Sequence, residues 1–138
     1  MLVLGIRFWQ QRDIVAGAAP SLPGVIWQKR PTLVHFWATW CPICKTEQGS
    51  IEDLAKDYPN TITIAMQSGE AVAVSKFMRE QSLNFPVVND ADGSISQAWG
   101  VHAVPASFIV DGAGQIRFVE VGYTTSWGLR LRLWLAQF

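Results

Sequence analysis

Cysteine is scarce in this sequence of 138 residues: Cys41 and Cys44 are the only two, and two residues separate them. Disulfide-stabilised secreted domains use more cysteines at wider spacings, and closing so short a loop removes little entropy from the unfolded chain. A structural zinc site needs about two further ligands. The two histidines, His35 and His102, lie at neither zinc-finger nor zinc-ribbon spacing from the pair. The cysteine pair is therefore interpreted as a redox group.

Charge is also sparse. Charged residues make up 16% of the chain, and 11 Lys plus Arg balance 11 Asp plus Glu. Because no basic stripe is visible, nucleic acid is not expected as a partner. The hydrophobic content of 49% argues against a disordered chain. The length is sufficient for one domain with its own apolar core.

Hydrophobic runs are too short to cross a bilayer, which requires about 20 apolar residues. Residues 1–6 are apolar, and Phe8 and Trp9 follow closely. Two interpretations stay open: the end of a truncated membrane anchor with these aromatic rings at the interface, or an ordinary apolar first turn. Residues 16–24 are rich in small residues and proline and resemble a linker. We expect an anchor end and linker over residues 1–17 and one domain over residues 18–138.

The remainder of the chain alternates between strand and helix patterns, which predicts an α/β fold. Strands are expected at residues 32–37, 61–66, 85–88, 106–110 and 115–120. Helices are expected at residues 41–58, 70–81 and 94–99. The turn residues at 111–114 predict an antiparallel hairpin. The C-terminal segment is ambiguous, because residues 129–133 alternate like a strand. Helix is preferred there, since one helical face would carry Trp127, Leu131, Trp134 and Phe138.

The cysteine pair lies where a strand pattern gives way to a helix pattern. Thiol–disulfide exchange needs a thiolate, and the free N–H groups and dipole at a helix start favour negative charge. Cys41 is therefore the expected nucleophile. Cys44 follows nearly one turn later on the same side, so we expect it to be more buried and to resolve the mixed disulfide. Pro42 suits the first helical turn.

Two side chains near the cysteine pair, Glu47 and His35, each have two interpretations. Glu47 lies three residues after Cys44, at the head of the core-facing stripe. It could accept the proton of a buried thiol, or it could be a solvated acid favoured by the helix dipole. His35 is interpreted as a hydrogen-bonded strand histidine, with a proton relay as the second possibility. Trp40 is expected to form a partly exposed wall beside Cys41.

Residues 35–45 and 100–111 together resemble the TlpA-like branch of bacterial thioredoxin-fold proteins, and the resemblance extends over about residues 18–138. Within that branch the sequence is most similar to ScsD-type proteins, which are linked to copper-sensitivity suppression. The resemblance implies a thioredoxin fold with a helix–strand insertion between the two halves of its core. It also implies that Pro105 is cis and faces the cysteine pair. The substrate-binding residues would be Trp40, Pro42, Ile43, Val104 and Pro105.

The resemblance carries functional expectations as well. Such proteins are tethered to the periplasmic face of the inner membrane and exchange disulfides with protein partners, without a cofactor or metal. We expect a monomer that reduces rather than oxidises and draws electrons from a membrane thiol-reductant conduit. Two departures matter. Ala106 stands where cytochrome c maturation thioredoxins have Glu, which disfavours a dedicated apocytochrome reductase. His35 stands where thioredoxin has a buried Asp, so that acid relay does not carry over.

A different class of function stays open. The cysteine sulfurs are soft ligands, and Cys41 and Cys44 could bind Cu(I), together with His102 or Met66. Copper proteins of the Sco type usually space their cysteines by three residues, whereas here the spacing is two. The spacing therefore favours the oxidoreductase.

Overall fold

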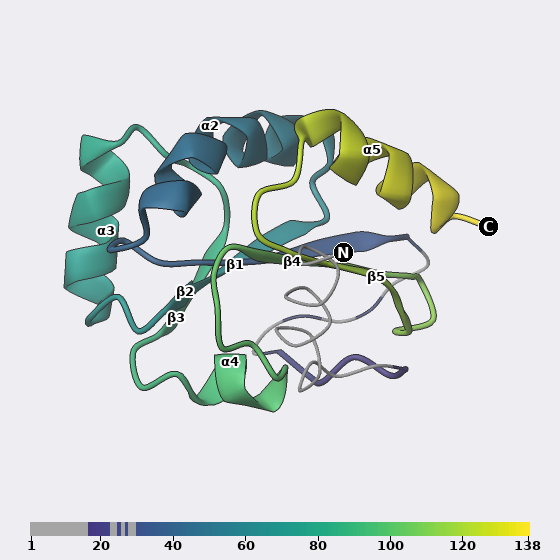
Figure 1. The fold of residues 1–138 in the computed structure, drawn as a ribbon, viewed down its shortest axis with the longest axis horizontal. Helices are drawn as coiled ribbons and strands as arrows, with labels where there is room; N and C mark the ends of the chain where they lie inside the picture. The colour runs from purple at the N-terminus through teal and green to yellow at the C-terminus, as the bar shows by residue number, and fades with distance from the viewer. Residues whose placement is uncertain (1–16, 23–24, 26, 28–29) are drawn as a thin grey trace, which may run out of the picture.

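A five-stranded mixed sheet forms the centre of the computed structural model, which describes residues 17–22, 25, 27 and 30–138 (Figure 1). The strand order is β3-β2-β1-β4-β5. The strands are β1 (Thr32–Trp37), β2 (Thr61–Met66), β3 (Val87–Asp90), β4 (Ala106–Val110) and β5 (Ile116–Val121). β1, β2 and β3 run parallel, whereas β4 pairs antiparallel with both β1 and β5. The predicted hairpin is thereby confirmed.

Among the described residues, four helices cover the sheet in two layers. They are α2 (Pro42–Asp57), α3 (Ala71–Glu80), α4 (Ser94–Ala98) and α5 (Ser126–Leu135). Figure 1 shows α2 and α5 over one face of the sheet and α4 on the other. The unit α3–β3–α4 stands between the β1–β2 half and the β4–β5 half of the chain, so the α/β fold and its insertion are as predicted.

The central strand β1 is buried along its whole length, as expected for an apolar strand covered on both faces. Leu33 and Trp37 point into the core beneath α2 and α5. Phe36 points into the opposite core, where its ring lies 5.7 Å from Trp99. Trp99 in turn packs edge-on against Phe108 at 4.9 Å. The layer on each side of β1 therefore has its own apolar core.

The edge strand β3 begins two residues later than the sequence pattern suggested. A strand was expected at residues 85–88, but the observed strand is Val87–Asp90. Phe85 packs into the core, and the Pro86 carbonyl accepts bonds from both the backbone N–H and the hydroxyl of Thr63, at 3.0 and 2.8 Å. Because Pro86 has no N–H to donate to the ladder, regular pairing starts after it.

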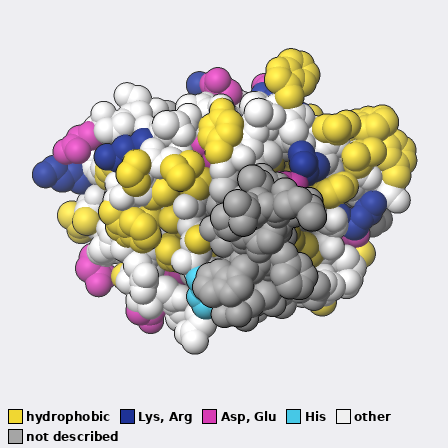
Figure 2. Space-filling view, viewed as in Figure 1, with side chains coloured by type: hydrophobic (Ala, Val, Ile, Leu, Met, Phe, Trp, Pro, Cys, Tyr) yellow, Lys and Arg dark blue, Asp and Glu magenta, His cyan; other side chains and the backbone are white. Residues whose placement is uncertain are grey.

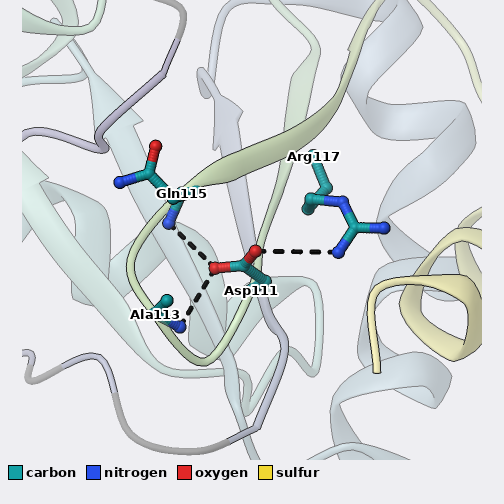
Figure 3. A network of polar contacts seen from close by, with 4 residues as sticks. All are labelled: Asp111, Ala113, Gln115 and Arg117. Atoms are coloured by element: carbon teal, nitrogen blue, oxygen red, sulfur yellow. Dashed lines mark hydrogen bonds and ion pairs between the residues drawn. The ribbon is translucent and has the colours of Figure 1, made fainter. Parts of the chain in front are cut away.

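The turn between β4 and β5 is closed by one aspartate (Figure 3). Asp111 Oδ1 accepts the backbone N–H groups of Ala113 and Gln115 at 3.0 and 2.9 Å, and Asp111 Oδ2 lies 3.6 Å from Arg117. These bonds satisfy turn N–H groups that the strand ladder leaves free. The hairpin therefore has a side chain that fixes its turn.

The C-terminal segment is a helix, as predicted, yet the apolar stripe that suggested it faces outward. Trp127 and Phe138 are 82% and 81% exposed, and Leu131 and Trp134 are about half exposed. The core-facing side of α5 is a second apolar set: Leu129, Leu133 and Ala136. α5 thus has apolar residues on two faces, of which its own domain covers one.

The anchor end and linker were expected over residues 1–17, of which residues 1–16 lie outside the described part of the chain. Among the described residues, no helix is both long enough and apolar enough to cross a bilayer.

Candidate active site

Cys41 caps the first turn of α2. Its backbone is extended, with φ −96° and ψ 112°, and its sulfur accepts the backbone N–H of Cys44 at 3.1 Å. Pro42 is the first helical residue, where a missing N–H has no cost. The strand-to-helix junction predicted from the sequence is therefore present. The sulfur of Cys41 therefore lies at the positive end of the helix dipole of α2.

Both sulfurs are enclosed. Cys41 is 4% exposed and Cys44 3%, so Cys44 is the more buried thiol as expected, but only by a small margin in this reduced state. The cause is the chain segment before β4. The Cys41 thiol donates to the Val104 carbonyl at 3.6 Å, and the Val104–Pro105 peptide, which is cis, packs beside it. Chemical difference between the thiols must therefore come from their surroundings.

The segment 104–105 is held in place by β5, the strand that pairs with β4. The backbone N–H of Gly122, at the end of β5, donates to the Pro105 carbonyl at 2.8 Å. Pro105 is buried and Val104 half-buried. The structure thus brings both residues to Cys41, as the family resemblance implied.

The exposed rim beside the sulfurs is apolar. Trp40 and Ile43 are 56% and 52% exposed, and Pro42 is exposed between them. Trp40 is fixed by a bond from its indole N–H to the Gln67 carbonyl at 3.0 Å. A substrate that reaches Cys41 would meet these side chains first.

The loop after β2 holds Thr39 and Trp40, the two residues that precede Cys41. The sequence did not indicate this role. The Ser68 hydroxyl accepts the backbone N–H of Thr39 at 3.0 Å and donates to the Met66 carbonyl at the same distance. Gln67, which holds Trp40, has a positive φ of 45°. The sequence signal was a break after the strand, which carries no information on these partners.

Cys44 lies deeper in a setting that disfavours its thiolate. Burial is the main cause that raises the pKa of the Cys44 thiol far above its ordinary value. The hydrogen bond with Cys41 and the charges of Cys41 and Glu47 raise it further, whereas the backbone of Ala38 acts in the opposite direction. Cys44 therefore needs help to lose its proton.

Glu47 lies one turn further along α2 and is fully buried, which excludes the solvated interpretation. Neither carboxyl oxygen has a hydrogen-bond partner among the described residues. Burial raises the pKa of Glu47 to about 7, and the backbone N–H of Thr124 offsets part of this shift without the geometry of a hydrogen bond. A carboxyl group that titrates near neutrality and acts on Cys44 electrostatically is suited to exchange a proton with it.

His35 has the first of its two expected roles. Its Nδ1 lies 2.8 Å from the Ser107 hydroxyl of the paired strand, and the ring is buried. Burial lowers the pKa of His35 to about 3. The ring is therefore neutral near pH 7 and resists protonation, so it is not suited to accept a thiol proton.

The structure places the further Cu(I) ligands that the sequence suggested. The described part of the chain contains no group of three or more His, Cys, Asp and Glu side chains that could hold a metal ion. Met66 belongs to the core on the α4 side of the sheet, whereas both cysteines belong to the core on the α2 side. His102 is exposed.

The buried His35 predicts a loss of stability in acid. Its folded pKa lies below the unfolded value of 6.5, so its contribution is complete above pH 6.5 and is lost as the pH falls toward 3. His35→Asn should reduce the slope of unfolding free energy against pH by up to about 1.4 kcal/mol per pH unit in that window. Denaturant titrations at several pH values measure the slope. Ser107→Ala, which keeps the imidazole, should retain it; equal slopes in His35→Asn and wild type would show that His35 is not the group responsible.

Comparison with known proteins agrees with this geometry. Residues 17–119 match the model of the AhpC/TSA family. A thioredoxin-like protein of Haemophilus influenzae is 32% identical over 111 residues, which cover 80% of this chain and 66% of that protein. Sporulation thiol-disulfide oxidoreductase A of Bacillus subtilis is 27% identical over an alignment that covers 91% of this chain and 88% of that protein. The chain spans about half the length of relatives named ResA and DsbE, at 53% and 52%.

A solved structure shows the same architecture. It is a secreted disulfide oxidoreductase of Mycobacterium tuberculosis, described as homologous to DsbE of E. coli. The two chains are 28% identical with a TM-score of 0.69, and the match covers 86% of this chain and 94% of that one. These relatives agree with the TlpA-like resemblance, and the narrower ScsD-type placement stays a prediction. The chain belongs to the AhpC/TSA family and has the thioredoxin fold of its thiol–disulfide oxidoreductase relatives.

Proposed function

We propose that this protein reduces disulfides in protein substrates through a mixed disulfide on Cys41, which Cys44 then resolves. The observation that carries the proposal is the position of the two sulfurs at the start of α2. Cys41 caps the helix and adjoins the exposed apolar rim, whereas Cys44 lies behind it beside a buried carboxyl group.

The first step uses Cys41 as nucleophile. Its thiolate attacks one sulfur of the substrate disulfide, the substrate S–S bond breaks, and a new S–S bond joins Cys41 to the substrate. The other substrate sulfur leaves as a thiolate and takes a proton from water. The rim of Trp40, Pro42 and Ile43 would contact the substrate on one side. The backbone of Val104, 3.6 Å from the sulfur, would contact it on the other.

The second step uses Cys44. The Glu47 carboxylate accepts the Cys44 proton, and the resulting thiolate attacks the Cys41 sulfur. The mixed disulfide breaks, Cys41 and Cys44 form a disulfide, and the second substrate thiolate leaves. Two electrons have then passed from the cysteine pair to the substrate. A dithiol donor must return them, for which we propose a membrane thiol-reductant conduit.

The reducing direction rests on the TlpA-like resemblance of residues 35–45 and 100–111. A periplasmic location with an amino-terminal tether is part of the proposal, and it is supported by relatives named DsbE and a relative described as secreted.

Replacing the resolving cysteine should trap the intermediate. Cys44→Ser should accumulate a covalent complex with disulfide-bonded insulin as the test substrate, and Cys41→Ser should not, because exchange begins on Cys41. Non-reducing electrophoresis and mass spectrometry measure the complex, which should dissolve with dithiothreitol. If Cys44→Ser traps nothing while the wild type retains stoichiometric Cu(I) through gel filtration, the copper-binding interpretation replaces the proposal.

Removing the buried carboxylate should slow only the second step. In the wild type, resolution should accelerate as the pH rises through about 7, since Glu47 must be ionised to accept a proton. Glu47→Gln should lower the resolution rate about 10- to 100-fold at pH 8 and weaken this pH dependence. Rapid-quench kinetics of the mixed disulfide measure the rate.

Two controls separate this effect from misfolding. Asp53→Asn changes an exposed acid on the same helix and should leave resolution unchanged. Alkylation of Cys41 by iodoacetamide should proceed at the wild-type rate in Glu47→Gln. Equal slowing of alkylation and resolution would indicate a packing defect instead of a lost proton acceptor.

A further inference from the structure

The outward face of α5 is an apolar surface that the proposed chemistry does not use. It consists of Trp127, Leu131, Trp134, Leu135 and Phe138, which are between 38% and 82% exposed. Figure 2 shows hydrophobic side chains gathered at the upper right, where α5 lies in Figure 1. From the exposed fractions, the patch presents roughly 600 Å² of apolar surface. That is the upper end of what a monomeric protein usually exposes.

The spacing along this face is that of a helix-pairing seam. Trp127, Leu131 and Trp134 lie on α5 and Phe138 lies three residues beyond its end. They are separated by four, three and four residues, which is the a/d repeat of two helices packed side by side. The seam is symmetric about its centre. In an antiparallel pair of identical helices, Leu131 would therefore meet Trp134 of the other copy, and Trp127 would meet Phe138.

The charges of α5 favour a protein partner over a lipid surface. A helix that lies on a membrane directs cations toward anionic head groups. Here Arg130 is paired with Asp57 at 2.7 Å, and Arg132 with Glu120 at 2.8 Å. These ion pairs bind the arginines to their own domain. The net charge of the chain is zero, so two copies do not repel each other strongly.

The aromatic residues of the patch are partly ordered before any partner binds. Trp134 and Phe138 pack edge to face with ring centroids 5.3 Å apart. The neighbouring Arg132 is also ordered: it donates to the Gly128 carbonyl at 2.8 Å, which fixes its side chain along the helix. Rings already held in one arrangement lose less side-chain entropy on association.

We propose that two copies of this chain associate through α5 in an antiparallel, two-fold symmetric pair. The apolar patch approaches the roughly 800 Å² per partner of a standard interface, and flanking polar atoms would add to it. The Asp57–Arg130 ion pair places α5 beside the carboxyl end of α2, whereas Cys41 caps the amino end. The dimer would therefore leave both cysteine pairs open to substrate. This departs from the monomer expected from the family resemblance.

Sedimentation velocity from about 1 to about 200 µM tests the proposal on the full chain. The wild type should shift from monomer to dimer as concentration rises. Leu131→Glu combined with Trp134→Glu should weaken association at least ~100-fold, because two like charges would face each other across the seam. Val72→Glu is the matched control: Val72 is 80% exposed on α3, outside the patch, and its substitution should not change association.

A charge-complementary variant tests the orientation. Leu131→Glu combined with Trp134→Lys places opposite charges at the two positions that meet in the antiparallel pair, so it should associate more tightly than the double-Glu variant. In a parallel pair the same variant would oppose like charges and stay monomeric, which would overturn the orientation. Far-UV circular dichroism and insulin reduction per cysteine pair should match wild type in all variants, which separates this proposal from the proposed activity.

Two results would overturn the dimer itself. One is a wild type that stays monomeric at the highest concentration. The other is a dimer that the double-Glu variant leaves intact, which would place the contact elsewhere on the chain. Flotation with phosphatidylcholine–phosphatidylglycerol vesicles completes the test: a monomeric wild type that floats, while the double-Glu variant does not, would assign the face to a lipid surface.

Discussion

The site depends on one hydrogen bond, from the backbone N–H of Cys44 to the sulfur of Cys41. It makes a cysteine sulfur the N-cap of α2, a position that usually holds a serine, threonine, aspartate or asparagine side chain. Because the helix starts there, Cys44 lies in its first turn near the backbone of Ala38, and Glu47 follows three residues later on α2. The reactive sulfur, the resolving sulfur and the acid thus share one rigid element, which rests on the buried strand β1.

The two sulfurs differ because of what surrounds them, since their exposure is nearly equal. Cys41 caps a helix and donates to the Val104 carbonyl, whereas the charge of the buried Glu47 carboxyl group acts on Cys44. An unpaired buried acid costs stability once it ionises, and the folded chain keeps it nonetheless. Buried groups that lower stability in this way are commonly found at functional sites. The raised pKa of Glu47 follows from the same burial, so the destabilising feature and the chemically useful one are a single property.

The sequence was sufficient for features set by local pattern. The apolar run of β1, the break before Cys41 and Pro42 at the helix start together located the reactive pair, whereas the sequence left Glu47 open between a buried proton acceptor and a solvated acid. Features set by tertiary packing could not be predicted. The cover that Val104 provides over Cys41, the approach of Thr124 to Glu47 and the support of Trp40 by Gln67 all join segments distant in the chain. The outward direction of Trp127 and Phe138 was hidden because α5 has two apolar faces.

The central claim is that Glu47 is a buried proton acceptor for Cys44. Isotope-edited infrared spectroscopy of the reduced protein, with labelled glutamate and Glu47→Gln as the difference reference, reports the protonation of this carboxyl group directly. The structure predicts a protonated carbonyl band in mildly acidic solution that disappears as the pH passes through about 7. A band that is already lost near pH 4.3, the value of an exposed glutamate, would contradict the account.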